Sequence, residues 1–189
     1  AEDEAVEVSA IHSLAGRELT GLIVRPPYSD PHHSATPAAL VGGGTAELKP
    51  GAISLAHRGV LFLDECPDFG SKLDALRTPL EDGTITVSRA RHSTRFPARF
   101  QLVMAANPCP CGNFGVAGLE CRCDPTRGRR YQERLSGPIL DRIDIKHQMA
   151  AVNRVLLDVA ANPSESSATV LGRVVEARDR QRRRLAGTP

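Results

Sequence analysis

The chain has 189 residues, a net charge of +2 at pH 7, and a composition that is 41% hydrophobic and 24% charged. These proportions fit about one ordinary globular domain, so they exclude a disordered chain, a collagen-like repeat and a coiled coil. Aromatic residues make up only 4%, with no Trp, which argues against a surface that stacks the bases of single-stranded nucleic acid.

The N-terminus, AEDEAVEV, has neither the basic start nor the apolar stretch of a signal peptide, and no apolar run approaches 18 residues. We therefore expect a cytoplasmic protein that does not contact a membrane. The chain also begins without Met, which suggests a piece of a longer protein.

Charge is distributed unevenly along the chain. Residues 1–124 carry 11 Lys/Arg and 15 Asp/Glu, a net charge of −4, whereas residues 125–189 carry 13 and 7, a net charge of +6. The basic C-terminal third either faces phosphate or an acidic partner, or it is the solvated face of a helix. The second interpretation is the commoner one for such runs.

The predicted elements begin with a helix over residues 4–19, where apolar side chains recur at helical spacing. Residues 25–52 are rich in Pro, Gly, His and Ser, and we expect an irregular insertion with turns. The apolar run 59–65, GVLFLDE, predicts a strand that is buried on both faces. A short helix is expected over residues 71–80.

A β-hairpin is predicted over residues 83–99, because two β-branched, alternating segments flank a polar tip. Its return strand continues into a second buried strand that ends at Asn107. A Cys-rich loop over 108–125 and a helix over 126–136 follow.

The last predicted elements are a strand at 143–149, a linker at 151–166 and a helix over about 167–185, capped by Ser166 or Ser167. Buried strands that alternate with helices indicate an α/β fold with a mainly parallel sheet. In such sheets, ligands bind beyond the carboxyl ends of the strands.

Two of these strand ends carry polar groups suited to phosphate chemistry. An apolar strand followed by Asp-Glu is the pattern of a Walker B segment, in which Asp64 would orient a magnesium ion or its water shell. Glu65 would polarise the attacking water, and Asn107, at the end of the second strand, would sense the γ-phosphate. The alternatives are an ordinary acidic turn after the first strand and an Asn-Pro turn after the second.

Arg142, in the string SGPILDRID, is a fixed positive charge just before the third strand candidate. An arginine supplied to a neighbouring subunit's nucleotide would stabilise charge in the transition state. The alternative is a surface ion pair between Asp141 and Arg142.

Four cysteines form two C-x-C pairs separated by nine residues: Cys109, Cys111, Cys121 and Cys123. In a chain without a secretory signal such pairs suggest a metal site, and four thiolates suit tetrahedral zinc. The alternative is a set of reduced thiols in a turn-rich loop. For His32–His33, hydrogen bonding within the insertion is favoured over a metal pair, and Cys66 is expected to be a buried small residue.

Six strings carry a resemblance to a known family: RPPYSDPHHSATPAALVGGG, PGAISLAHRGVLFLDE, ALRTPLEDGTITVSRA, FPARFQLVMAANPCPCG, CRC and RLSGPILDRID. The strings lie within residues 25–144, and the resemblance extends over about residues 5–185. The chain resembles AAA+ ATPases of the magnesium-chelatase-like group and, within it, the bacterial ComM (YifB) family.

The resemblance implies a P-loop NTPase (AAA+) core that uses ATP and Mg²⁺, with an inserted hairpin and a Cys-rich loop that binds Zn²⁺. It also implies a homo-oligomeric, hexameric ring in which Arg142 acts in trans. Members of the family are taken to be DNA helicases that promote branch migration in transformation and recombination. In such a motor Arg89, Arg91 and Arg95, near the hairpin tip, would grip the DNA backbone. The alternative is that half of the hairpin arginines pair with nearby acids or neighbouring subunits.

The chain departs from this family in what it lacks, since it contains no G-x-x-x-x-G-K-[ST] phosphate loop. The resemblance implies that the first core strand and helix, the upstream N-terminal domain and most of the helical lid are missing too. The resemblance implies that the P-loop would precede residue 1. Residues 1–150 would then be a partial AAA+ core, truncated at its N-terminus, and 167–189 the first helix of a helical lid. We therefore expect ATP hydrolysis only in an intact parent protein.

Two other functions remain open at this point. The same core would serve the ATPase subunit of a metal-insertion complex of the magnesium chelatase type. A non-catalytic remnant, or a zinc-stabilised interaction module, is the third interpretation.

Overall fold

A computed structural model describes residues 2–44, 47–89, 92–116, 118–149 and 165–186. The chain divides into two compact units, Ala1–His147 and Gln148–Pro189. Within the described residues of the second unit, the regular structure is helix α7 (Ser167–Leu185).

The first helix is shorter than the predicted 4–19. Helix α1 (Glu2–Leu14) buries Val8 and Ile11. It ends there because Gly16 adopts a φ of +86°, a left-handed conformation that closes a helix at little cost for glycine.

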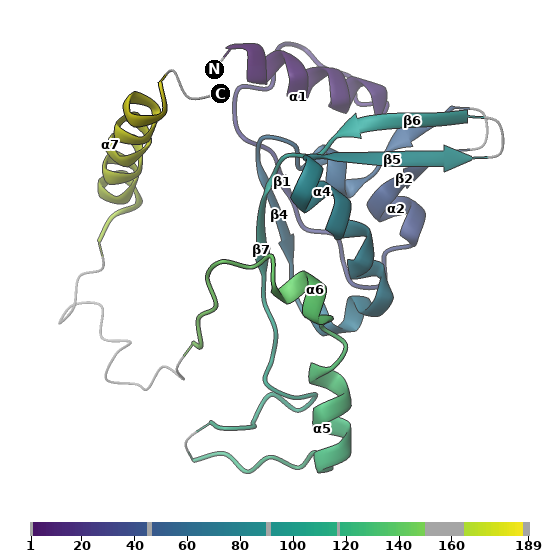
Figure 1. The fold of residues 1–189 in the computed structure, drawn as a ribbon, viewed down its shortest axis with the longest axis vertical. Coiled ribbons are helices and arrows are strands. Elements are labelled where there is room, and N and C mark those ends of the chain that lie inside the picture. The colour runs from purple at the N-terminus through teal and green to yellow at the C-terminus, as the bar shows by residue number, and fades with distance from the viewer. Residues whose placement is uncertain (1, 45–46, 90–91, 117, 150–164, 187–189) are drawn as a thin grey trace. The chain divides into compact units, whose positions relative to one another are not determined.

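A three-stranded parallel sheet forms the centre of the first unit (Figure 1). Its order is β1 (Tyr28–Ser29), β4 (Val60–Leu63) and β7 (Gln101–Met104). Both pairings are parallel, with Leu61 opposite Leu102. This confirms the predicted α/β class with a parallel sheet.

The segment 25–52 is more regular than expected, because it supplies β1 and three further elements. Helix α2 (Pro37–Val41) is capped by the Thr36 side chain, and β2 (Gly42–Gly43) pairs antiparallel with β3 (Lys49–Pro50). A Cβ on Gly51 would lie only 2.4 Å from the Gly42 nitrogen, so this pairing requires glycine. The short helix α3 (Ala52–Leu55) follows.

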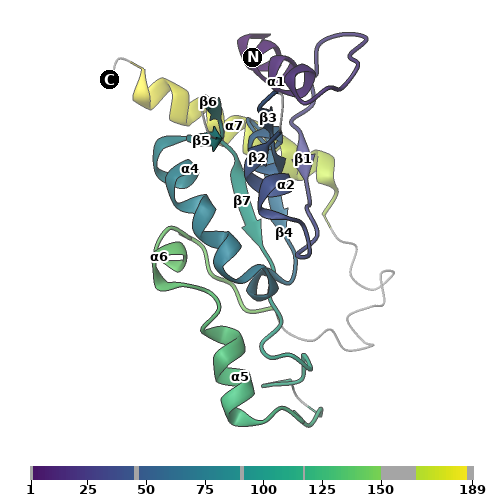
Figure 2. The same cartoon turned by 90° about the vertical axis from the view of Figure 1, so that its right-hand side faces the viewer.

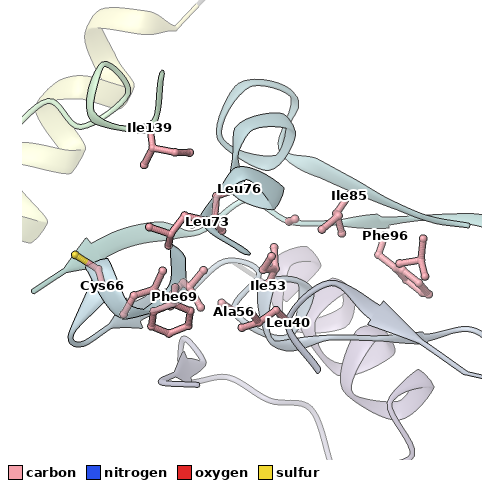
Figure 3. Close-up of a cluster of buried hydrophobic side chains, with 14 residues drawn as sticks. Leu40, Ile53, Ala56, Cys66, Phe69, Leu73, Leu76, Ile85, Phe96 and Ile139 are labelled. Atoms are coloured by element: carbon pink, nitrogen blue, oxygen red, sulfur yellow. The ribbon is translucent and has the colours of Figure 1, made fainter. Parts of the chain in front are cut away.

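One face of the sheet is covered by a 3-10 segment, η1 (Cys66–Leu76), and by α4 (Arg77–Asp82), as Figure 2 shows. The predicted helix 71–80 spans the junction of these two elements. Side chains from the strands, η1 and the hairpin form one buried cluster, part of which is labelled in Figure 3: Leu40, Ile53, Ala56, Leu61, Leu63, Cys66, Phe69, Leu73, Leu76, Ile85, Val87, Phe96, Ala98 and Ile139.

The strands are buried less completely than expected. In β4 the side chains of Leu61 and Leu63 are fully buried, while Val60 and Phe62 on the opposite face are half-buried. In β7, Val103 is 42% exposed. The prediction of strands buried on both faces was therefore wrong, because in this unit the described apolar packing gathers on the η1 side.

Because the two faces of the sheet are buried to different extents, shortening a side chain should lower the free energy of unfolding more on one face than on the other. Replacing Leu61 by Ala should lower the free energy of unfolding by about 2–5 kcal/mol, because the cavity lies in a closely packed core. Val103→Ala should cost less than about 1 kcal/mol, since the side chain is already partly in water. Urea unfolding of both variants tests this, and equal losses would contradict the one-sided packing.

The hairpin forms as predicted within 83–99. Strands β5 (Thr84–Arg89) and β6 (His92–Pro97) pair antiparallel with Arg89 opposite His92. Ile85, Val87 and Phe96 are buried and anchor its base in the core. The hairpin extends from the end of the sheet opposite to the Cys-rich loop in both views (Figures 1 and 2).

Two short helices follow the Cys-rich loop: α5 (Pro125–Gln132) and α6 (Gly137–Leu140). The helix predicted over 126–136 therefore begins one residue earlier and ends four residues earlier, at Gln132. The strand predicted at 143–149 is wrong, since these residues are irregular and Ile145 and Met149 are more than 80% exposed. A strand needs a neighbour that supplies hydrogen bonds, and none of the described strands pairs with this segment.

Helix α7 matches the predicted helix 167–185, and the Ser166 hydroxyl caps it by accepting from the Thr169 amide at 3.2 Å. None of its residues is buried. Arginines along it pair with acids on the same helix, as in Arg180–Glu176. Most of the predicted linker 151–166, namely residues 151–164, lies outside the described residues. None of the helices in the described ranges is both long and apolar enough to cross a membrane.

Candidate functional site

The acidic and amide side chains predicted for phosphate chemistry follow neighbouring parallel strands. Asp64 and Glu65 come directly after β4, and Asn107 follows β7 by three residues. The ladder continues past both strands, because the Ala105 amide donates to the Leu63 carbonyl and the Cys66 amide to the Ala105 carbonyl, each at 2.9 Å. The strand ends are thus held side by side.

A pocket of about 420 Å³ opens at this edge of the sheet. Its lining joins the strand ends to α5 and consists of Glu65, Asp68, Asn107, Pro110, Arg127, Arg130, Tyr131 and Arg134. The structure therefore brings Glu65 and Asn107 to one cavity. Asp64 is exposed beside it, outside the lining, and its carboxylate accepts the Glu65 amide at 2.8 Å.

Glu65 has a left-handed backbone, with φ of 49° and ψ of 41°. This conformation is uncommon for a residue other than glycine. Such strain is tolerated where surrounding structure fixes it, and it is concentrated at functional sites.

The Glu65 carboxylate also contacts a residue that the sequence did not assign to the site. His33 Nδ1 lies 2.9 Å from Glu65 Oε2. The ammonium of Lys72 donates to the backbone carbonyls of His33 and Ala35, which fixes the loop. Within the insertion, His32 Nδ1 lies 2.7 Å from the Ser34 hydroxyl, which is the kind of hydrogen bond expected for the His32–His33 pair. No local pattern connects residue 33 with residue 65, so only the fold reveals the contact.

Arg142 does not line this pocket. Its guanidinium pairs with the Glu81 carboxylate and donates to the Pro138 carbonyl, and the side chain is half-buried. The predicted alternative of an Asp141–Arg142 pair is thus replaced by a pair with Glu81. The structure leaves the role of Arg142 in trans a prediction.

The two C-x-C pairs, near the start and near the end of the Cys-rich loop, come together in space. Their sulfur atoms all lie within 4.8 Å of one another, and Cys109 Sγ is 3.4 Å from Cys111 Sγ and 3.7 Å from Cys121 Sγ. Four sulfurs bound to one zinc ion at 2.3 Å would be about 3.8 Å apart. The arrangement thus fits a tetrahedral metal site.

The thiols of the cluster differ in pKa. Backbone amides of Asn113 and Arg122 lower the pKa of Cys111 to about 6, because they stabilise its thiolate. Contact with Cys111 raises the pKa of Cys123 to about 12. The fifth cysteine, Cys66, is buried in the core as expected, and burial raises its pKa to about 11.

The hairpin arginines are described only in part. Arg95 is exposed, and its partner in the register is Thr86. Arg89 is the last residue of β5, and Arg91 falls outside the described residues. The Ser88 and Ser93 hydroxyls are 2.9 Å apart across the strands, which supports the described end of the hairpin.

The sequence is similar to known proteins over most of its length. The family described as "Magnesium chelatase, subunit ChlI" matches residues 1–157. The chain is 50% identical to YifB of Escherichia coli and 47% identical to competence protein ComM of Haemophilus influenzae, and each alignment covers 96% of this chain. A 99-residue stretch, 52% of this chain, is 31% identical to 11% of DNA replication licensing factor mcm-6 of Caenorhabditis briggsae.

The chain spans about a third of the length of the curated relatives: 36% of YifB and 35% of ComM. The matching residues include both strand ends, the hairpin and the cysteine cluster. The chain therefore belongs to the magnesium chelatase ChlI family of AAA+ proteins and is a ComM/YifB-like member of it.

Proposed function

We propose that this chain is the catalytic part of an ATP-driven ring motor that moves DNA, with helicase or branch-migration activity. The observation that supports it most strongly is the convergence of Glu65 and Asn107 on one pocket at the carboxyl ends of β4 and β7. Ligands of α/β proteins bind at this edge.

In this proposal Asp64 holds Mg²⁺ through its water shell, Glu65 orients the attacking water, and Asn107 contacts the γ-phosphate. The Glu65 carboxylate is kept in position by His33 at 2.9 Å. The magnesium ion, when bound, neutralises charge that develops on the phosphate oxygens. Because this chain carries no phosphate loop, the remaining contacts to ATP come from another segment of the whole protein.

Arg142 would complete the site of a neighbouring subunit in a homo-oligomeric, hexameric ring. Arg142 lies outside the lining of its own pocket, as this proposal requires. The free thiols suit the cytoplasm, where cysteines stay reduced, and Zn²⁺ is the metal whose size and ligand preference match the Cys109–Cys123 cluster.

The DNA contact is assigned to Arg89, Arg91 and Arg95 of the hairpin. Arg91→Gln and Arg95→Gln should each weaken binding to duplex DNA and lower the salt dependence, by about 0.9 in the slope of log K against log salt for each lost phosphate contact. Fluorescence anisotropy at several salt concentrations measures this, in a chimaera where this chain replaces the matching segment of Escherichia coli YifB.

Lys146→Gln provides the matched control, because Lys146 is exposed, carries the same charge and lies outside the hairpin. An equal loss of affinity in the control would contradict a specific role of the hairpin. ATPase activity that is stimulated by DNA supports the motor. ATPase activity that is the same with and without DNA supports a metal-insertion ATPase instead.

A further inference from the structure

The wall of the pocket opposite the strand ends is formed by α5 and the turn after it. Arg127, Arg130, Tyr131 and Arg134 recur at positions i, i+3, i+4 and i+7, and all four line the pocket. This spacing puts the first three on one face of α5, and Arg134 follows in the turn after the helix. Arg129, on the same helix, is exposed and is not part of the lining.

Two of these arginines carry charge that the described protein does not neutralise. Arg134 pairs with Asp68 at 2.6 Å, and His33 engages Glu65 at 2.9 Å. The guanidinium groups of Arg127 and Arg130 have neither an ion pair nor a hydrogen bond within the described part of the chain. Each acid of the pocket thus has a partner, and the lining, with three arginines and two acids, has a net charge of +1 when His33 is neutral.

The position of this basic face is fixed at both ends of α5. Asp124 caps the helix by accepting the Thr126 amide at 2.8 Å, immediately after the last cysteine of the cluster. Gln132 donates to the Pro108 carbonyl at 3.0 Å, next to Cys109. The helix is therefore tied to both ends of the Cys-rich loop.

We propose that Arg127 and Arg130 form a phosphate-binding site that faces Glu65 and Asn107. Its ligand is a phosphate dianion, either the terminal phosphate of a nucleotide or the orthophosphate that hydrolysis releases. A planar guanidinium donates two parallel hydrogen bonds to phosphate oxygens, and two such groups match the charge of a dianion. The hydroxyl of Tyr131, in the same wall, is a further donor, because burial raises its pKa.

The site rests on the proposed function only for the origin of its ligand, so binding can be measured without catalysis. Isothermal titration of the 189-residue chain with sodium phosphate, at constant ionic strength, should give saturable binding. Arg127→Gln and Arg130→Gln should each weaken it at least about tenfold, since each removes charge-assisted hydrogen bonds. Arg129→Gln, which removes the same charge from the same helix, should change it less than about twofold.

A second titration, with ATP, identifies the source of the phosphate. ATP binding with the same dependence on Arg127 and Arg130 supports a nucleotide phosphate, whereas binding of orthophosphate alone supports the released product. The Arg130→Lys variant, which keeps the charge, should retain part of the affinity.

The proposal is overturned if neither ligand binds, or if Arg129→Gln loses as much affinity as the pocket variants. Circular dichroism of each variant verifies that α5 is still folded. Failure of the proposed ATPase activity would leave these binding results unchanged, so the two failures are distinguishable.

Discussion

Glu65→Gln is expected to reduce ATP hydrolysis by about 100-fold or more while nucleotide still binds, because the amide cannot accept a proton from the attacking water. The side chain keeps its shape, so the contact with His33 at 2.9 Å and the strained turn after β4 should persist. Steady-state phosphate release in the YifB chimaera gives the rate, and equilibrium binding of a fluorescent ATP analogue gives the affinity.

Glu133→Gln is the matched control, since Glu133 is an exposed acid at the end of α5 and is absent from the pocket lining. It should hydrolyse ATP at the unmodified rate. If Glu65→Gln retained full activity, or if it lost nucleotide affinity in proportion to rate, Glu65 would not be the group that activates water. The 189-residue chain alone should show no turnover, because its sequence contains no phosphate loop.

The cysteine cluster is expected to hold about one zinc ion per chain, and Cys121→Ser should reduce this content to near zero. Cys121 is half-buried, and its sulfur lies 3.7 Å from both Cys109 Sγ and Cys111 Sγ, so its loss opens the ligand set. The variant should also melt at a lower temperature, since binding energy at a structural metal site is folding energy. Atomic absorption of freshly purified protein and thermal unfolding measure the two effects.

Cys66→Ala is the control for metal content, because Cys66 is a buried thiol outside the cluster. Its zinc content should match the unmodified protein even if its stability is lower. Acid should release the metal, since each cysteine thiol must lose its proton to bind zinc as a thiolate. Wild-type protein that holds no zinc and takes none up would reject the assignment.

The sequence predicted the elements whose signals are local. The apolar run before Asp64 forms β4, the run before Asn107 forms β7, and the alternating segments of 83–99 form the hairpin. Ser166 caps the last helix as predicted. In each case neighbouring residues carry the information, through periodicity, capping or turn chemistry.

The errors arose where an element depends on a distant partner. The segment 143–149 has the composition of a strand, yet no described strand pairs with it. Residues 25–52 looked irregular, but Tyr28–Ser29 pair with β4 as soon as the sheet assembles. A strand of two residues is too short to show an alternating pattern, so it is recognised only when the strand beside it is known.

For the candidate site, the sequence by itself determined the chemistry of the strand ends: an acid pair after one apolar strand, an Asn after the next and four clustered cysteines beyond it. Tertiary structure alone decided what faces them. His33 reaches Glu65 across 32 residues, and the arginines of α5 reach the same pocket after the Cys-rich loop folds back. The physical reason is that these contacts result from the packing of η1, α5 and the sheet. Such packing joins residues that are far apart in the sequence, so no repeat or regular spacing along the chain indicates it.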